Sequence, residues 1–349
     1  PYPENLAASQ RYRFEQYLDT LREAGFQLEL APFFRKETWE VLYKQGHWVQ
    51  KIIGTLVGLT KRFLLLFKVS KFDWIFIHRE ALPFGPPVYE WILTKLLRKK
   101  IVFDFDDAIW IHQASRGNAL ISHLKSADKT ATICELSKKV VAGNYYLEGY
   151  AQKRNLNVQV IPTTIDTEYH DRTKNHTEKE VVTLGWTGTH STLPYLQLLI
   201  RPLKQLERRY PVKLLVIADQ KAALEIQSVE FRTWSIEAEV EDLLDIDIGL
   251  MPLPETEWAK GKCGLKALQY MALGIPAVVS SVGVNQEIVT HGEHGFCCGT
   301  ESEWEKYLEI LIQDIELRNR MGRLGRSKVE QLYSVKANKS NYLSLFYDD

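Results

Sequence analysis

Short apolar runs alternate with longer amphipathic stretches along most of the chain. One series of buried strands is predicted at residues 27–30, 74–77, 101–105, 130–133, 140–142 and 158–161. A second series is predicted at residues 181–184, 212–217, 246–250 and 276–280. Because most of these runs are short and largely apolar, helices are expected to cover both faces of each sheet, which is typical of parallel sheets. The pattern predicts an α/β protein.

A polar run at residues 167–180 lies between the two series and is predicted to be a linker. It divides the chain into two Rossmann-like domains, residues 1–166 and 181–330, and a terminal helix is expected within residues 331–349. Ligands of such sheets bind at the carboxyl ends of the strands, so the expected binding site is a cleft between the two domains. A doubly wound domain normally begins with its central strand, so we expect residues before Pro1 that supply it.

Two amphipathic stretches of the first domain predict helices. Ser9 is expected to cap a helix that ends at Gly25. Residues 51–69 combine apolar clusters with lysines and an arginine, and they are too charged and too interrupted for a transmembrane span. The interpretation we favour is a helix that packs on the first sheet, and the alternative is an amphipathic helix that touches a membrane surface.

Charge balance and cysteine spacing give no support for a nucleic-acid partner, a Cys/His metal site or a disulfide framework. The chain has 349 residues, and 44 Lys and Arg balance 44 Asp and Glu, so bulk charge gives no indication of a nucleic-acid partner. The four cysteines, Cys134, Cys263, Cys297 and Cys298, lack metal-ligand spacing with histidine. A vicinal pair is also a poor structural disulfide, so a reducing, cytoplasmic location is expected.

The most informative chemistry lies in residues 261–276. A glycine-rich loop with two lysines leads into an amphipathic helix predicted to begin near Gly264. Helical spacing separates an apolar face, which begins with Leu265, from a face that carries Lys262, Lys266 and Gln269. Two cations and an amide at the positive end of a helix suit a diphosphate and a neighbouring sugar hydroxyl.

This segment resembles the donor-binding signature of GT-B glycosyltransferases, specifically the retaining family 4 (glycosyl transferases group 1). The resemblance implies the GT-B fold, with two Rossmann-like domains and a terminal helix that crosses back to the first domain. In the family an acidic residue precedes the loop and a second Glu, eight positions later, binds the donor ribose. Here Gly261 and Gln269 stand at those positions. Glu255 or Glu257 could replace the first.

The opening of the second domain is the other candidate for donor binding. A strand ends at Gly185 to Gly188, and a helix is expected to begin near Ser191, where amides could bind phosphate. Family relatives place an Arg and a Lys here on the donor phosphates, and this chain has neither, so Lys262 and Lys266 are expected to carry more of that charge. Thr189 and Ser191 are expected to contribute to this site, to cap the helix, or to do both. Trp234 either stacks on the nucleotide base or belongs to the core.

Three carboxylates follow a predicted strand of the first domain, at Asp104, Asp106 and Asp107. Asp104-Phe105-Asp106 matches the Asp-x-Asp pattern of a manganese site. GT-B enzymes work without a bound metal, so we expect Asp106 and Asp107 to recognise an acceptor hydroxyl, and Asp104 to cap a helix. His78 and Arg79, at the end of the preceding strand, would face the cleft.

The resemblance implies residue roles on both domains. Pro3 to Arg13 resembles the loop after the family's first strand, so Arg11 or Arg13 is expected to reach the cleft while the other is solvated. The expected catalytic residues are Asp106, Asp107 and Lys266. The expected donor-binding residues are Gly185, Gly188, Thr189, Trp234, Lys262, Gly264, Leu265, Lys266 and Gln269, and the expected acceptor-side residues are Arg11, Arg79 and Asp106.

The expected function is a metal-independent, retaining transfer of a sugar from a nucleotide-diphospho-sugar to an acceptor hydroxyl, in bacterial glycan or glycolipid synthesis. No cofactor is expected beyond the donor, which acts as a co-substrate. The expected partners are the donor and a glycan or lipid-linked acceptor, at a cytoplasmic location that includes the inner face of the membrane. The alternatives are a non-catalytic nucleotide-sugar-binding protein and a GT-B epimerase.

Overall fold

The computed structural model describes residues 2–42, 44, 46–111, 128–221 and 223–347. The chain divides into two compact units. Unit 1 comprises residues 1–162 and 339–349, and unit 2 comprises residues 163–338. Each unit contains one parallel sheet, so the α/β class predicted from the apolar runs is confirmed.

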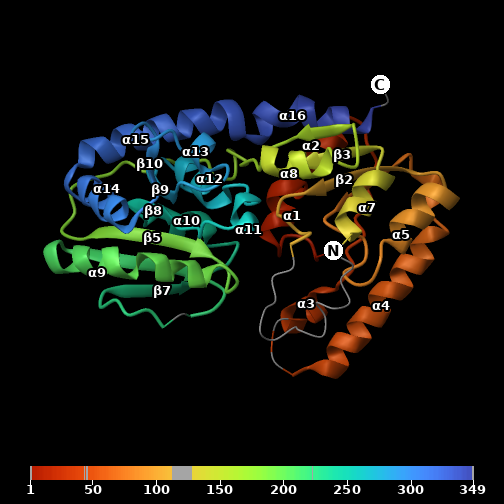
Figure 1. Cartoon of the computed structure of the whole chain (residues 1–349), viewed down its shortest axis with the longest axis horizontal. Helices are drawn as coiled ribbons and strands as arrows, with labels where there is room; N and C mark the ends of the chain where they lie inside the picture. Colours follow the sequence, from red (N-terminus) through yellow and green to blue (C-terminus); the bar gives the residue numbers. More distant parts are fainter. Residues whose placement is uncertain (1, 43, 45, 112–127, 222, 348–349) are drawn as a thin grey trace. The chain divides into compact units, whose positions relative to one another are not determined.

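The sheet of unit 1 has four strands in the order β1-β2-β3-β4 (Figure 1). They are β1 (Trp74–His78), β2 (Lys100–Phe105), β3 (Lys139–Ala142) and β4 (Val158–Val160). Its α-helices are α1 (Ala8–Arg13), α2 (Leu18–Glu23), α3 (Lys36–Leu42), α4 (Trp48–Leu66), α5 (Val88–Trp91), α7 (Lys129–Leu136) and α8 (Tyr145–Ala151). The parallel register places His78 opposite Asp104, so the ends of β1 and β2 meet.

Three predictions for unit 1 are wrong. Residues 27–30 lie outside any helix or strand, largely at the surface. Residues 130–133 belong to α7 instead of a strand, because the fold buries Ile133 and Cys134 on one side of a helix despite the β-branched residues around them. Ser9 does not cap a helix but lies inside α1, whose N-cap is Ala7.

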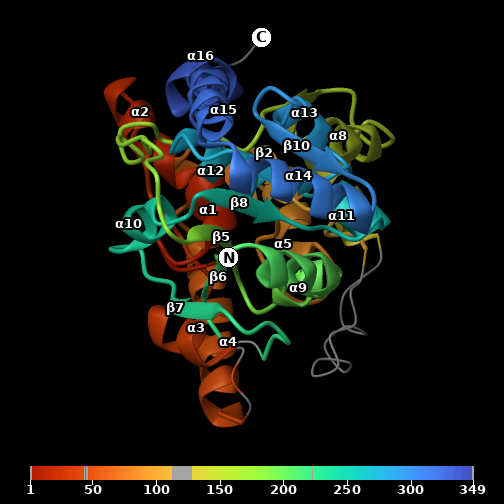
Figure 2. The same cartoon turned by 90° about the vertical axis from the view of Figure 1, so that its left-hand side faces the viewer.

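The interpretation that residues 51–69 pack an apolar face on the sheet is wrong, as the burial pattern of α4 shows. Its buried residues are Gly54, Gly58 and Arg62, while most of its large apolar side chains are exposed. Figure 2 shows α4 beside α3, which it contacts. No helix in the described part of the chain is long and apolar enough to cross a membrane.

The sheet of unit 2 has six parallel strands in the order β10-β9-β8-β5-β6-β7. They are β5 (Val182–Gly188), β6 (Val212–Ala218), β7 (Val229–Thr233), β8 (Ile248–Met251), β9 (Ala277–Ser280) and β10 (Gly295–Cys298). Strands β7 and β10 are absent from the predicted series. Helices α9 and α14 contact each other, and they pack on strands of this sheet, α9 on β6 and α14 on β9 and β10.

The α-helices of unit 2 pack an apolar core around this sheet. They are α9 (Ile200–Arg209), α10 (Glu239–Leu244), α11 (Glu257–Lys260), α12 (Leu265–Ala272), α13 (Asn285–Ile288), α14 (Glu301–Gln313) and α15 (Ile315–Lys328). The core is rich in leucines of α9 and α14 and in valines of the strands. Residues 171–179 have no regular structure, but they belong to unit 2, where Lys174 forms an ion pair with the buried Asp247 at 3.0 Å.

The last helix, α16 (Val335–Leu343), begins in unit 2 and ends in unit 1. Within unit 1 the ring of Tyr342 stacks on Tyr17 with 3.9 Å between centroids. Lys139 Nζ donates to the carbonyls of Ser344 at 3.0 Å and Tyr347 at 2.8 Å. The chain therefore returns to unit 1 at its end, as the GT-B resemblance implies.

Candidate functional site

The strand order of unit 2 reverses between β5 and β8. Strands β6 and β7 follow on one side of β5, and β8, β9 and β10 lie on the other. Ligands of open parallel sheets bind outside the carboxyl ends of the strands at such a switch point. The residues that follow β5 and β8 are therefore the first candidates for a binding site.

The glycines of β5 have different roles. A Cβ on Gly185 would lie 2.2 Å from Ile246 Cγ1, so the small size of this mid-strand residue serves packing. Gly188 ends the strand, and a Cβ there would lie 2.5 Å from the ring of Trp186. Beyond it, the hydroxyls of Thr189 and Ser191 bond to each other at 2.8 Å, and the 3₁₀ helix Leu193–Leu199 has no side-chain cap. The alternative that these two residues cap a helix is wrong.

A His–Asp pair, which the sequence analysis missed, lies at the ends of β5 and β6. His190 Nδ1 is 2.5 Å from Asp219 Oδ2, and the His190 backbone N–H donates to Asp219 Oδ1 at 2.6 Å. Asp219 directly follows a strongly predicted strand, so its place at the edge of the sheet was available from the pattern.

Helix α12 begins as predicted. Its N-cap, Gly264, has a φ of 71° and no side chain that could occupy the amides of the first turn. Lys266 Nζ lies 5.4 Å from the ring centroid of Trp186 in β5, and Lys262 Nζ lies 5.1 Å from that of Trp258. These contacts keep both cations near the helix N-terminus.

Tyr270 fixes α12 to the switch point. Its hydroxyl accepts from the Thr187 N–H in β5 at 3.1 Å and donates to the Leu250 carbonyl in β8 at 3.3 Å. Burial raises the pKa of this phenol well above its usual value, so the hydroxyl keeps its proton. One buried side chain therefore joins α12 to both strands at the point where the order reverses.

Glu239, which the sequence analysis also missed, joins two of the predicted donor-binding residues. Trp234 Nε1 donates to Glu239 Oε1 at 3.1 Å, and Gln269 Nε2 approaches the same oxygen at 3.4 Å. Gln269 and Glu239 are each 4% exposed, whereas Trp234 is only half-buried. Trp234 is therefore not a core residue, and a carboxylate lies beside position 269.

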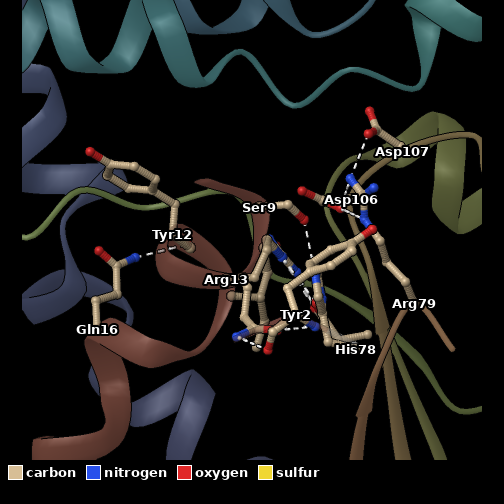
Figure 3. Close-up of polar contacts among 12 residues, drawn as sticks. Tyr2, Ser9, Tyr12, Arg13, Gln16, His78, Arg79, Asp106 and Asp107 are labelled. Atoms are coloured by element: carbon tan, nitrogen blue, oxygen red, sulfur yellow. Dashed lines mark hydrogen bonds and ion pairs between the residues drawn. The ribbon is translucent and has the colours of Figure 1, made fainter. Parts of the chain in front are cut away.

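In unit 1 a buried chain of polar contacts runs from Arg13 to Ser9 (Figure 3). Arg13 Nη2 is 2.5 Å from Asp104 Oδ1, and His78 Nδ1 is 2.7 Å from Asp104 Oδ2. His78 Nε2 in turn lies 2.7 Å from the Ser9 hydroxyl. Asp104 is in β2 and pairs with a buried cation, so the expectation that it caps a helix is wrong.

In this series of contacts, the positive charge of Arg13 balances the negative charge of Asp104, so a charged His78 is not needed. Burial alone would raise the pKa of Asp104, but Arg13 and the His78 hydrogen bond outweigh it and hold that pKa below its usual value. Burial lowers the pKa of His78 more than Asp104 and Asp106 raise it. The contacts suit a neutral imidazole that donates from Nδ1 and accepts at Nε2.

Arg79 pairs with both of the other aspartates. Its Nη2 lies 2.8 Å from Asp106 Oδ1 and 2.6 Å from Asp107 Oδ2, and Figure 3 shows the guanidinium directed at both carboxylates. Burial alone would raise the pKa of Asp106, but Arg79 outweighs it and holds that pKa far below the usual range. Asp106 is therefore an ionised acceptor of hydrogen bonds and a weak base.

The expected exposure of Arg11 or Arg13 is wrong. Both are buried: Arg13 donates to Asp104 and to the Ile161 carbonyl, and the Arg11 guanidinium lies 5.1 Å from the Tyr12 ring centroid. The family resemblance predicted that this segment borders the cleft, but only the fold shows that both of its arginines are buried.

The aspartates of the Asp-x-Asp pattern pair with different cations, Asp104 with Arg13 and Asp106 with Arg79. Among the described residues, no group of three or more His, Cys, Asp or Glu could hold a metal ion.

Comparison with known proteins identifies the relatives of this arrangement. Residues 181–314 match the sequence profile of the family described as glycosyl transferases group 1. N-acetyl-alpha-D-glucosaminyl L-malate synthase of Bacillus anthracis is 30% identical over 111 residues. That match covers 31% of this chain and 28% of the relative.

Solved structures resemble most of the chain. Sucrose-phosphate synthase from Thermosynechococcus elongatus matches with a TM-score of 0.66 and 15% identity, over 85% of this chain and 78% of that chain. HepE from Anabaena, in complex with UDP and glucose, matches with a TM-score of 0.62 and 14% identity, over 82% of this chain and 80% of that chain. These likenesses establish the GT-B fold. The resemblance to glycosyl transferases of group 1 is confirmed over residues 181–314.

Proposed function

We propose that this GT-B glycosyltransferase moves a sugar from a nucleotide-diphospho-sugar to an acceptor hydroxyl with retention of configuration. The observation that carries the proposal is the start of α12, where an uncapped N-terminus and Lys266 lie against β5 at the switch point. Helix N-terminal amides and a nearby cation favour a diphosphate. A solved structure of the same fold holds UDP and glucose, which supports a nucleotide sugar as the donor.

Lys266 and Lys262 would stabilise the leaving group. As the bond from the sugar C1 to the diphosphate oxygen breaks, negative charge grows on that oxygen, and fixed cations and amides lower its energy. The acceptor hydroxyl would attack C1 from the face that the leaving group vacates, and its proton would pass to the departing diphosphate. The attack on the vacated face preserves the configuration at C1.

The nucleoside would bind beside Trp234, Glu239 and Gln269. The half-buried indole offers a face for the base, and its N–H is held by Glu239. Carboxylate and amide oxygens suit ribose hydroxyls. Glu239 would then supply the negative charge that family relatives have at the position of Gln269.

Asp106, Asp107 and Arg79 would bind the acceptor. Arg79 fixes both carboxylates, and the ionised Asp106 can accept a hydrogen bond from an acceptor hydroxyl without removing its proton. We propose a glycan or lipid-linked acceptor, in bacterial glycan or glycolipid synthesis, for a cytoplasmic enzyme. A lipid-linked acceptor would be met at the inner face of the membrane.

Lys266→Ala tests the donor site. We expect it to weaken binding of a nucleoside diphosphate by about tenfold to a hundredfold, because a charge-assisted phosphate contact contributes about 1.5–3 kcal/mol. Binding of the nucleoside alone should be nearly unchanged, and calorimetric titration measures both. Lys306→Ala, at an exposed position on α14, is the matched control. An equal loss for both ligands would instead indicate a misfolded domain.

Metal independence is a separate part of the proposal. The three aspartates of the Asp-x-Asp region are paired with Arg13 and Arg79, which supports a role without a divalent cation. We expect sugar transfer to continue in excess EDTA at the rate measured without it. Loss of transfer that manganese or magnesium restores would contradict this expectation.

A second candidate function is non-catalytic binding of a nucleotide sugar. The replacement of both signature glutamates by Gly261 and Gln269 favours it. Release of nucleoside diphosphate from a nucleotide sugar, with or without an acceptor, distinguishes the two. Tight binding without any turnover would favour the binding protein.

A further inference from the structure

Helix α4 packs on unit 1 with its smallest residues. A Cβ on Gly54 would lie 2.3 Å from Thr38 Cγ2, and a Cβ on Gly58 would lie 2.7 Å from the ring of Phe33. One turn further on, Arg62 donates to the carbonyls of Ala81 at 3.0 Å and Ala31 at 2.6 Å. The contact is close and fixed by hydrogen bonds, and it leaves the large apolar side chains of α4 outside it.

Those apolar side chains form one face of the helix, which we call the α4 face. Trp48 is 68% exposed and Phe63 is 60% exposed, at opposite ends of the helix. With about 100° between successive residues, its members lie within one half of the helix surface. The α4 face consists of Trp48, Val49, Ile52, Ile53, Leu56, Leu59, Phe63 and Leu64, and the exposed Phe67 continues it beyond the end of the helix.

The segment that carries the α4 face is cationic, and Glu37 of the neighbouring α3 is an acidic group close enough to act on Lys61. Residues 41–72 contain no Asp or Glu but carry Lys44, Lys51, Lys61, Arg62, Lys68 and Lys71. By helical spacing, Lys61 lies about 60° beyond Leu64 and Lys51 lies about 60° before Trp48, toward the side that packs on unit 1. Lys44, Lys68 and Lys71 are exposed at its ends. Long lysine side chains can keep their charge in a polar layer while the neighbouring apolar groups are buried.

We propose that the α4 face docks on the surface of an anionic lipid bilayer. The helix has 19 residues, about 28 Å at its rise per residue, and it would lie in the plane of the interface. Its apolar side chains would enter the acyl boundary while the lysines contact lipid phosphates. A second copy of the chain fits less well, because pairing two such faces would bring two cationic rims together.

The inference stands on α4 alone and does not depend on the proposed transferase activity. It changes the favoured interpretation of residues 51–69, since the packed side of this helix is glycine and the apolar side is open. If the transferase proposal is also correct, docking would hold the enzyme at the membrane that carries a lipid-linked acceptor.

Vesicle flotation tests the proposal with phosphatidylcholine vesicles that either contain or lack phosphatidylglycerol. We expect the wild-type chain to bind the anionic vesicles and to dissociate as salt is raised. The double variant Ile52→Asp/Phe63→Asp should bind at least about tenfold more weakly, because two apolar side chains are lost from the interface. Leu156→Asp is the matched control, since Leu156 is fully exposed on unit 1 outside α4.

Two further measurements separate the outcomes. Circular dichroism and nucleotide binding should be unchanged in the double variant, which excludes unfolding as the cause of weaker flotation. Lys68→Glu/Lys71→Glu should reduce binding to anionic vesicles more than binding to neutral ones. Failure of the wild-type chain to float, or equal flotation of the double variant, would overturn the proposal. A wild-type dimer that becomes a monomer in the double variant, without flotation, would assign the α4 face to self-association instead.

Discussion

At the residue scale, neighbouring aspartates of unit 1 differ in their partners. Asp104 is fully buried between Arg13 and His78, whereas Asp106 and Asp107 share Arg79 nearer the surface. A buried ion pair contributes little net stability relative to an apolar pair, but removal of one partner leaves an uncompensated charge. Asp104 is therefore a structural residue, and the acceptor role that we propose is assigned to its two neighbours alone.

Asp104→Ala is expected to lower the free energy of unfolding by about 3–5 kcal/mol, because the Arg13 guanidinium would stay buried without a counter-ion. Urea denaturation followed by circular dichroism measures this loss. Asp19→Ala removes an exposed pair with Arg22 and should cost about 1 kcal/mol or less. Similar costs for the two variants would show that the Arg13 charge finds another partner.

At the element scale, the start of α12 depends on one glycine. Gly264 adopts the left-handed conformation, with φ 71°, between the lysine loop and the first turn of the helix. A Cβ there would lie 2.0 Å from Ile288 Cδ1, the mobile end of a side chain. The backbone conformation is therefore the main constraint at this position, and the contact with Ile288 is secondary.

Gly264→Ala should destabilise the protein by about 1–2 kcal/mol, the cost of the left-handed conformation for an L-residue. It should also weaken binding of a nucleoside diphosphate, because relief of the strain moves the amides of the first turn. Thermal denaturation and calorimetric titration measure the two effects. Gly149→Ala on α8, where an added Cβ meets nothing within 4 Å, should be neutral or stabilising. Full nucleotide binding by Gly264→Ala would remove these amides from the donor site.

At the scale of the whole molecule, both units bury histidines whose pKa lies below the usual value. Burial is the largest cause for His78 in unit 1 and for His176 and His294 in unit 2. The folded state keeps these imidazoles neutral at a pH where the unfolded chain takes up protons. Their contribution to stability is therefore complete above the unfolded pKa and is lost as the pH falls below it.

We expect the free energy of unfolding to fall between about pH 7.5 and about pH 5.5, by up to about 1.4 kcal/mol per pH unit for each such histidine. Urea denaturation at the two pH values measures the change. His78→Gln should reduce this pH dependence, because it removes a buried imidazole of unit 1. An identical pH dependence for wild type and His78→Gln would show that folding does not change the pKa of His78.

Much of the fold was predictable because it depends on local apolar pattern. Buried parallel strands form continuous apolar runs, so eight of the strands were predicted, with shifted ends, from the runs at residues 74–77 through 276–280. The strand predicted at the exposed residues 27–30 is wrong. The strand predicted at residues 130–133 is also wrong, because the β-branched residues of α7 favour a strand in a sequence-based prediction. The half-buried β7 and the glycine-led β10 give weak periodic signals and were missed.

The sequence by itself determined the α/β class, the family resemblance and the start of α12, because these follow from apolar spacing and from the backbone freedom of glycine. Only the tertiary structure decided which charges meet. It brought Glu239 beside Gln269, Asp104 between Arg13 and His78, and Arg79 to two aspartates, across as many as 91 positions of the chain. It also turned the glycines of α4 toward the protein and its apolar face outward. Spacing along a helix or strand defines a face, but the packing of distant segments decides which face is buried.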